Sequence, residues 1–385
     1  MNFEEKDLLW AKEVFAKIDT KMEKTIERTM GTIPYFSVDG KFNDMTKTNV
    51  GFWTNGFYAA TLWILYHQTK NEKYRIAAED QEKSLDPAFN NYFKLHHDVG
   101  FLRQLTSVLN YKLTGNEESR VKGMYAASLL TSRFNIDGKY IRAWQHRQHM
   151  EDTDEGWAII DTMMNLSVLY WASEQVEDPR FARIAKAHAD QTVKHHIRED
   201  GSVKHIVSYD PNTGEEIENF AGQGYSVDSS WTRGQGWAIY GLMNSYYHTQ
   251  DKKYLEACKR VSNYFIAEIA KDDWLPVCDF RAPKYPEIWD SSAGGLAACG
   301  FLELAKVLGE IDGRCYKEAA IKILRAMEEK FCDWNPETDG MVHYGTVRYH
   351  ANENESDPHN RYIVYSDFYF TEAITKILGT DLQIW

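Results

Sequence analysis

The chain has 385 residues, of which 43% are hydrophobic and 14% aromatic, so it can bury a large core and does not belong to the disordered class. Its 57 acidic side chains outnumber the 44 basic ones, and the formal charge of -13 opposes binding to nucleic acid or anionic membrane surfaces. Any anionic ligand must therefore be held by local donors.

The first segment, 1–16, is amphipathic and lacks the apolar run and small-residue cleavage site of a secretory signal. No segment approaches the ~18 uncharged apolar residues that would predict a membrane span. The cysteines lie far apart, in the spacing of neither a zinc site nor a disulfide framework. We therefore expect a reduced, cytoplasmic protein.

Two kinds of helical segment alternate along the chain. One kind is amphipathic: in 316–327, apolar residues recur at intervals of three and four, which indicates one wet face. The other kind is apolar nearly all round, as in 157–171 and 237–247, which predicts a helix buried on every side. We expect outer helices near 5–29, 72–84, 117–133, 179–196, 252–269 and 314–331, and inner helices near 52–67, 97–112, 156–172, 232–248, 291–307 and 365–378.

Six outer-then-inner pairs predict an all-α fold, an (α/α)6 barrel. No low-complexity linker interrupts the series, so we interpret 1–385 as a single domain, with two stacked helical domains as the alternative. Inner-to-outer links are short, whereas outer-to-inner links, such as 134–155 and 197–231, are long. Because helices alternate in direction around the ring, the long links should share one face, where the inner helices begin and their dipoles favour an anion.

Asp161 is the single charge in the apolar segment 157–171. An ionised carboxylate buried there is unfavourable unless it is paired, and desolvation would raise its pKa toward the value that a general acid needs. We interpret Asp161 as catalytic. The alternative is a buried carboxylate that is hydrogen-bonded to another inner helix.

Asp98 stands where the second inner helix is expected to start. Its position fits a catalytic group and a helix N-cap equally well, because Asp is a preferred N-cap residue. Asp290 and Asp367 have the same ambiguity, and for those two we favour capping or packing.

Amide, guanidinium and indole groups gather in the segments 222–226 and 230–237. Arg233 offers the planar donor fork that suits a carboxylate. Trp53 and Trp144 stand at other loop-to-helix junctions, which favours an aromatic-walled pocket for a sugar ring, although a core position is the alternative for any single Trp. His205, in a long loop of the same face, is a further candidate donor to a substrate oxygen.

Five motifs resemble, in order, the unsaturated glucuronyl hydrolases of glycoside hydrolase family 88, over most of the chain from Gly51 to about Asp367. They are Gly51-Phe52-Trp53-Thr54-Asn55-Gly56, His97-Asp98-Val99-Gly100-Phe101, Ile160-Asp161-Thr162-Met163-Met164-Asn165, Gly222-Gln223-Gly224-Tyr225-Ser226 and Trp231-Thr232-Arg233-Gly234-Gln235-Gly236-Trp237. Each motif is modest alone, and their order makes the set specific. The family fold is an (α/α)6 barrel, in agreement with the helix pattern.

The resemblance implies removal of a 4,5-unsaturated uronic acid from the non-reducing end of lyase-generated oligosaccharides, by hydration of its vinyl ether. By analogy, Asp161 protonates C4 and then, as carboxylate, helps to deliver water to C5, and the resulting hemiketal opens and releases the aglycone. Asp98 matches the family's second essential aspartate, which positions the ring hydroxyls. The positions that match substrate contacts are Trp53, Trp144, His205, Gln223, Arg233 and Trp237.

Neither a metal nor an organic cofactor is expected; His96, His97 and Asp98 are adjacent and cannot all face one ion from a helix. The expected partners are unsaturated uronate-containing di- or oligosaccharides, without nucleic acid or membrane, and the chain is expected to be a monomer or a weak homo-oligomer. The related unsaturated rhamnogalacturonyl hydrolases are the nearest alternative. A non-catalytic sugar-binding helical toroid is the alternative of another class, and it would leave the buried charge of Asp161 without a purpose.

Overall fold

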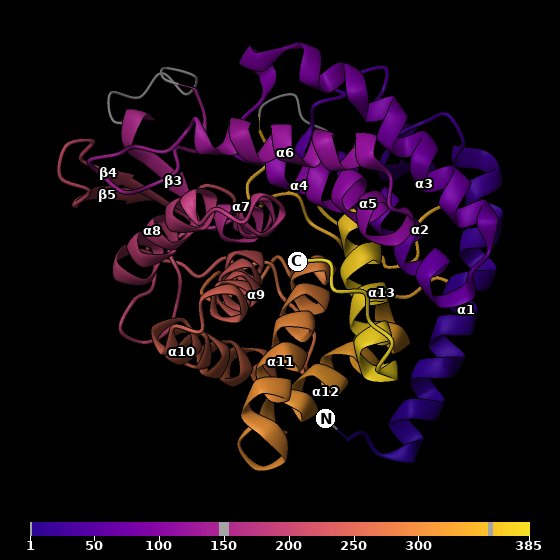
Figure 1. Ribbon diagram of the computed structural model, residues 1–385. Helices are drawn as coiled ribbons and strands as arrows, with labels where there is room; N and C mark the ends of the chain where they lie inside the picture. The colour runs from indigo at the N-terminus through magenta and orange to yellow at the C-terminus, as the bar shows by residue number, and fades with distance from the viewer. Residues whose placement is uncertain (1, 146–153, 353–356) are drawn as a thin grey trace.

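The computed structural model describes residues 2–145, 154–352 and 357–385, and its helices form two concentric rings (Figure 1). The outer ring contains α1 (Glu5–Thr29), α3 (Glu72–Leu85), α6 (Glu117–Thr131), α8 (Arg180–His195), α10 (Lys252–Ile269) and α12 (Arg314–Phe331). The inner ring contains α2 (Phe57–Thr69), α4 (Val99–Arg103) continued by α5 (Leu109–Thr114), α7 (Thr162–Val176), α9 (Thr232–Thr249), α11 (Ser291–Asp312) and α13 (Val364–Leu378). The expected (α/α)6 barrel and its helix pairs are confirmed.

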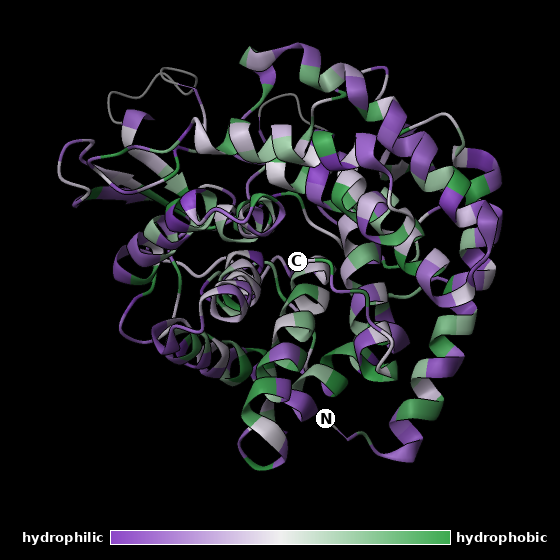
Figure 2. Cartoon of the chain, viewed as in Figure 1, coloured by the Kyte–Doolittle hydropathy of each residue, from purple (hydrophilic) through white to green (hydrophobic). Residues whose placement is uncertain are grey.

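The inner ring closes on itself because each inner helix packs against the next and α13 packs against α2. Outer helices bury one face: in α1, the buried residues Ala11, Val14, Ile18 and Met22 recur at helical spacing. Figure 2 shows the matching mixture of hydrophilic and hydrophobic residues along α1. One hydrophobic cluster extends from α1 to the residues after α13, which supports the single-domain interpretation.

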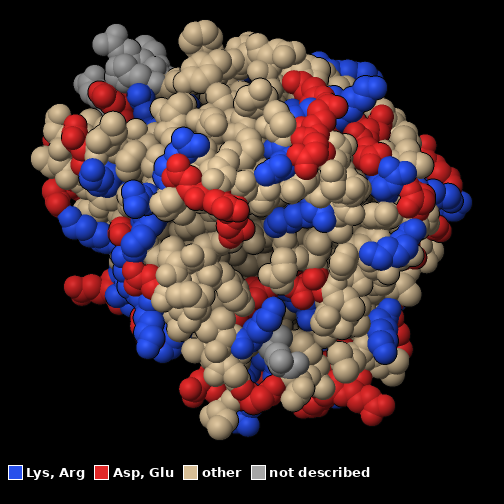
Figure 3. All heavy atoms as spheres, viewed as in Figure 1, with Lys and Arg blue, Asp and Glu red and all other residues tan. Residues whose placement is uncertain are grey.

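Helix α11 is long and apolar enough to cross a membrane by length and composition, although Glu303 and Lys306 interrupt its run of uncharged residues. However, 78% of its most apolar window is buried inside the protein, as in the core helix of a barrel. On the face of the molecule seen in Figure 3, acidic and basic side chains are interspersed. The excess negative charge is therefore not gathered into a single patch on that face.

In three of the short inner-to-outer links, a residue with left-handed backbone conformation ends the inner helix, and the next residue caps the N-terminus of the outer helix. Lys70, Gly115 and Gln250 end their helices at φ 58°, 76° and 56°. The side chains that then cap the following outer helices belong to Asn71, Asn116 and Asp251. These links therefore need few residues, and the long links remain for the other face.

The long links contain strands that the all-α expectation did not include. A hairpin joins β1 (Pro34–Val38) to β2 (Lys41–Asp44), and a three-stranded antiparallel sheet has the order β3 (Trp157–Ile159), β4 (Ile206–Tyr209) and β5 (Glu216–Phe220). The third inner helix consequently begins at Thr162 and not near 156. A short apolar run fits a buried strand as well as a helix, so its periodicity could not separate the two.

The residues after α13 return across the inner ring, where the C-terminus lies in Figure 1. The Trp385 ring lies among aromatic residues of the inner helices, with its centroid 6.0 Å from that of Phe101 and 6.4 Å from that of Tyr369. The Gln104 side chain donates to the Ile384 carbonyl oxygen at 2.5 Å. The barrel is thus closed at the end away from the long links.

Candidate active site

A cavity of about 940 Å³ lies among the long links, and every outer-to-inner link except 270–290 contributes to its lining. Six of the eight residues predicted from the sequence line it together. They are Trp53, Asp98, Trp144, Asp161, His205 and Gln223. The prediction that distant motifs meet at one face is therefore confirmed for these six.

Asp161 lies at the N-cap position of α7 and not one turn inside the helix, because the preceding residues form β3. Its side chain forms no capping hydrogen bond, and the residue is only 6% exposed. Oδ2 has no hydrogen-bond partner among the described residues, and it lies 3.5 Å from His205 Nε2. A buried carboxylate that is unused by its own helix and that lines a cavity is available for chemistry.

The β3–β4 pairing brings His205 to Asp161, since the Ile160 N–H donates to the His205 carbonyl oxygen at 3.0 Å. The Gln223 N–H lies 2.9 Å from His205 Nδ1, which is closer than the Ala221 oxygen at 3.1 Å. Accepting this N–H assigns the ring hydrogen to Nε2, the atom that faces Asp161. His205 is thereby a donor directed at the carboxylate.

Asp98 occupies the N-cap position of α4, but its side chain does not cap that helix. Oδ1 accepts from Asn165 Nδ2 at 2.9 Å and lies 3.3 Å from His97 Nε2. Burial and then the negative charge of Asp161 raise the Asp98 pKa well above its usual range. The capping alternative is therefore wrong for Asp98, and its burial beside Asp161 favours a proton on the pair.

The histidines beside Asp98 are consistent with a protonated carboxyl group. Burial lowers the His97 pKa well below its usual range, and burial and then Arg133 lower that of His96 to about 4. His97 Nδ1 lies 2.8 Å from the Ala143 carbonyl oxygen, which can only accept, so Nδ1 carries the ring hydrogen. The lone pair of His97 Nε2 then faces Asp98 Oδ1. Both atoms are acceptors, so a proton on Asp98 is needed to form a hydrogen bond between them.

The ligand atoms of His96, His97 and Asp98 lie within 4.8 Å of one another. The expectation that these three side chains could not face one ion was wrong, because they precede α4, which begins only at Val99. The shared proton accounts for these contacts without an ion. That no metal is needed stays a prediction.

Asn165 is a site residue to which the sequence analysis gave no role. Its amide nitrogen holds Asp98, and its Oδ1 accepts from the Phe101 N–H at 2.7 Å, so it joins α7 to α4. A Cβ atom at Gly100 would lie 2.9 Å from the Asn165 Cα, and this close approach requires glycine. An Asn one turn after Asp161 in an apolar helix was the available signal.

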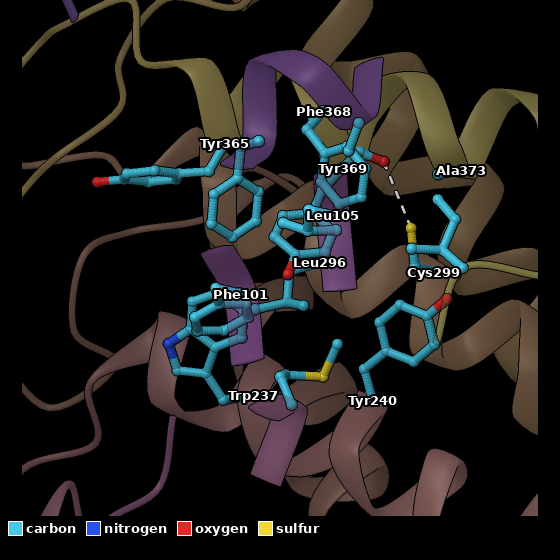
Figure 4. Packing of buried hydrophobic residues seen from close by; sticks show 14 of the residues in the cluster. Phe101, Leu105, Trp237, Tyr240, Leu296, Cys299, Tyr365, Phe368, Tyr369 and Ala373 are labelled. Atoms are coloured by element: carbon cyan, nitrogen blue, oxygen red, sulfur yellow. Dashed lines mark hydrogen bonds between the residues drawn. The ribbon is translucent and has the colours of Figure 1, made fainter. Parts of the chain in front are cut away.

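Arg233 and Trp237 do not line the cavity, which corrects the expectation of direct substrate contact. Both are fully buried, and Trp237 packs against Phe101 in the core (Figure 4). The Arg233 guanidinium pairs with Asp290 and donates to the carbonyl oxygens of Thr346 at 2.7 Å and Val347 at 2.8 Å. A guanidinium engaged in this way positions the wall and does not project into the cavity.

The 346–349 segment is fixed from a second side by Gln223. Its Nε2 donates to the Val347 carbonyl oxygen at 2.6 Å, and its own carbonyl oxygen accepts from the Tyr349 N–H at 2.9 Å. Arg348, between these anchored residues, lines the cavity, as does Lys94. Sequence reasoning assigned neither cation to the site, because single basic residues on long links form no recognisable pattern.

The aromatic wall has two parts. The Trp53 ring stacks on Tyr365 with centroids 5.1 Å apart and an interplanar angle of 27°. The Trp144 ring meets His97 edge-on at 5.5 Å and Trp157 at 6.1 Å. These contacts hold the indoles in place as apolar surfaces against which a sugar ring can lie.

Asp290 and Asp367 are structural, as favoured from the sequence. Asp290 caps α11 through the Ser292 N–H at 3.2 Å, besides pairing with Arg233. Asp367 accepts from the Met341 and Val342 N–H groups at 2.9 and 2.8 Å. Neither residue lines the cavity.

An aromatic-walled cavity with two buried carboxyl groups, one of which has a raised pKa, has the character of a glycoside hydrolase site. Residues 25–376 match the model of Glycosyl Hydrolase Family 88. The chain belongs to this family, and it is a glycoside hydrolase.

Relatives of known name cover most of the chain. An unsaturated glucuronyl hydrolase of Bacillus sp. (strain GL1) is 32% identical over 84% of this chain and 86% of its own length. An unsaturated chondroitin disaccharide hydrolase of Streptococcus pneumoniae is 30% identical over 84% and 81%. The crystal structure of the Bacillus sp. GL1 enzyme superposes with a TM-score of 0.87 and 30% identity, covering 95% of this chain and 96% of that one.

Proposed function

We propose that this chain removes a 4,5-unsaturated uronic acid from the non-reducing end of oligosaccharides produced by polysaccharide lyases. The observation that carries the proposal is the Asp161 side chain, which is unused by its own helix and lines the cavity beside Asp98, whose pKa is raised by burial. The named relatives act on unsaturated glucuronyl or chondroitin disaccharide substrates by their descriptions, which supports the same substrate class here. A mutant of the Streptococcus agalactiae enzyme complexed with dGlcA-GalNAc6S, 25% identical with a TM-score of 0.82, gives further support.

The proposed reaction adds water across the C4=C5 bond. In the reacting form, the one proton of the Asp98–Asp161 pair lies on Asp161. Asp161 transfers this proton to C4, and the positive charge that develops on C5 is shared with the ring oxygen. Asp161, now a carboxylate, takes a proton from water as the water oxygen bonds to C5. The hemiketal opens by breaking the bond from C5 to the ring oxygen, and the hemiacetal left at C1 releases the aglycone as an alcohol.

The neighbouring groups have distinct roles in this proposal. Asp98 binds a ring hydroxyl, and it shares one proton with Asp161, so that the pair carries a single negative charge. The His205 Nε2–H stabilises the Asp161 carboxylate after proton transfer. Trp53 and Trp144 form the apolar walls against which the sugar ring lies.

Arg233 and Trp237 contact residues that line the cavity but do not line it themselves. Arg233 holds Thr346 and Val347, so that Arg348 stays at the cavity. Trp237 supports Trp53, with their ring centroids 6.4 Å apart. Both residues are therefore proposed as positioning residues.

We further propose that the protein works in the cytoplasm as a monomer or a weak homo-oligomer. The five cysteines are free, which suits a reducing compartment.

The function is tested by following the loss of absorbance of the conjugated enol ether. Unsaturated disaccharides from hyaluronan, chondroitin, heparin and gellan lyases are compared with unsaturated rhamnogalacturonan products. Turnover of the glucuronyl substrates is expected. Turnover of the rhamnogalacturonan products alone would assign the alternative hydrolase, and binding without turnover of any substrate would contradict the proposed reaction.

A further inference from the structure

A second, smaller cavity of about 210 Å³ lies outside the candidate active site. Two arginines, Arg133 and Arg142, line it together with polar side chains and one exposed carboxylate, that of Glu155. The polar lining residues are Tyr92, Ser132, Asn135, Tyr140 and Gln145. This composition suits a small polar ligand.

The two arginines are cross-strand neighbours in a tight reversal of the chain. Phe134 and Ile141 form an antiparallel bridge, and the Arg142 N–H donates to the Arg133 carbonyl oxygen at 3.0 Å. Arg133 also donates through Nε to the Arg142 carbonyl oxygen at 2.9 Å. Like charges directly opposite each other destabilise a strand pair, so this arrangement calls for a compensating anion.

No described carboxylate forms an ion pair with either guanidinium group: Glu155 lines the cavity at an exposed position, and the charge of Asp98 acts on Arg133 from farther away. Arg142 Nε and Nη2 are buried and have no hydrogen-bond partner in residues 2–145, 154–352 and 357–385. Arg133 donates to backbone carbonyl oxygens, the second being that of Ala143 at 3.2 Å. Burial and then the charge of Arg142 lower the Arg133 pKa to about 10, which shows that the two charges act on each other.

We propose that Arg133 and Arg142 form an oxyanion-binding site, separate from the candidate active site, that takes a sulfate, phosphate or carboxylate group. The planar guanidinium fork donates two parallel hydrogen bonds to such a group. The oxyanion comes either from solution or from an acidic sugar of a bound oligosaccharide. A bound oligosaccharide can reach the arginines because the two cavities are adjacent. Trp144 lines the candidate active site, and the next residue, Gln145, lines the smaller cavity. The Gln145 side chain also donates to the carbonyl oxygen of Leu95, which lines the candidate active site, at 3.4 Å.

Isothermal titration with sodium sulfate, at an ionic strength matched with sodium chloride, tests the site. Saturable binding to the wild type is expected, weakened at least ~10-fold in Arg142→Gln. Lys139→Gln removes the same charge from the exposed part of the same reversal and should bind sulfate as the wild type does. Absence of saturable binding to the wild type, or equal binding by Arg142→Gln, would overturn the proposal.

Two further measurements complete the test. The melting temperature of Arg142→Gln should not fall, because Nε and Nη2 make no hydrogen bond within the described protein. Arg142→Lys keeps the positive charge but lacks the planar donor fork, so it should bind sulfate more weakly than the wild type and more tightly than Arg142→Gln. Kinetics then identify the source of the anion. A raised KM of Arg142→Gln for an acidic tetrasaccharide but not for a disaccharide assigns it to the glycan, and unchanged values for both assign it to free anions.

Discussion

The Asn165 side chain ties Asp98 to the helix that follows Asp161. Nδ2 donates to Asp98 Oδ1 at 2.9 Å and lies 3.3 Å from the Asp161 carbonyl oxygen. The two carboxyl groups belong to residues at the starts of different inner helices, and the Asn165 amide fixes the position of one relative to the other. The charge of Asp161 then contributes to the raised pKa of Asp98, which makes the two groups a coupled pair.

Replacement of Asp161 by Asn should abolish proton transfer while keeping shape. Turnover is expected to fall by ~10²-fold or more, with substrate binding retained, because the amide has no proton to give to C4. Steady-state kinetics and titration of a disaccharide measure the two effects. Asp137→Asn, at an exposed position, is the control, and near-normal turnover of Asp161→Asn would exclude its assigned role.

Asp98→Asn should change the pH profile as well as the rate. If the singly protonated pair is active, the alkaline limb reports loss of its last proton, which the mutual repulsion of the two carboxylates delays to higher pH. The substitution removes the Asp98 carboxyl group, whose pKa is raised, and with it the repulsion between the two carboxylates. The alkaline limb should therefore move to lower pH, and an unmoved limb would show that the two groups are not coupled in the reaction.

Solvent isotopes distinguish hydration from ordinary glycoside hydrolysis. Turnover in deuterium oxide should place deuterium at C4 of the uronate, and oxygen-18 water should first label C5. Ordinary hydrolysis would label C1 with oxygen and leave C4 untouched. Because the C5 ketone exchanges its oxygen and enolises, the products must be read early, by mass spectrometry or NMR, beside a sample without enzyme.

Arg233→Ala should lower both stability and substrate affinity. The substitution leaves Asp290 buried without its ion-pair partner, which costs ~3–5 kcal/mol and should lower the melting temperature by roughly 4–6 °C in a chain of 385 residues. Loss of the Thr346 and Val347 contacts should raise KM. The double variant Arg233→Ala/Asp290→Asn should recover part of the stability; a single variant that melts like the wild type would contradict the positioning role.

Asp367 should make stability depend on pH. Burial raises its pKa to about 7, above the unfolded value of about 3.9, so its stabilising contribution is full below about pH 4 and is lost as pH rises through about 7. The melting temperature of the wild type should therefore fall relative to Asp367→Asn between those pH values. A difference that stays constant with pH, as expected for the exposed control Asp137→Asn, would contradict this titration.

The helix pairs could be predicted because burial leaves a periodic record. Outer helices such as α1 alternate wet and dry faces, and inner helices such as α9 are apolar all round. The strand β3 left no such record, since three buried residues in a row fit either structure. This ambiguity is why Asp161 was expected inside a helix and lies instead at its N-cap.

The site was predictable where the residue type itself signals chemistry, and not where contact geometry decides. Asp161, Asp98 and Trp53 meet in the cavity as the motifs predicted. Arg233 looked like a carboxylate ligand, but its partners come from segments more than 50 residues away, which no local pattern announces. Asn165 was missed for the same reason, because its importance lies in a contact across two helices.

The short links and the cavity lie at opposite ends of the barrel helices, since the cavity is lined by the long links. Because these links connect the helices away from the cavity, the chain can be opened there, between Gly115 and Asn116 for example, without cutting a cavity-lining segment. A circular permutant with new ends at that link should keep its catalytic rate. Attachment to a support through the Gln250–Asp251 link should likewise leave the cavity open to solution, whereas insertions in the long links alter what the cavity accepts.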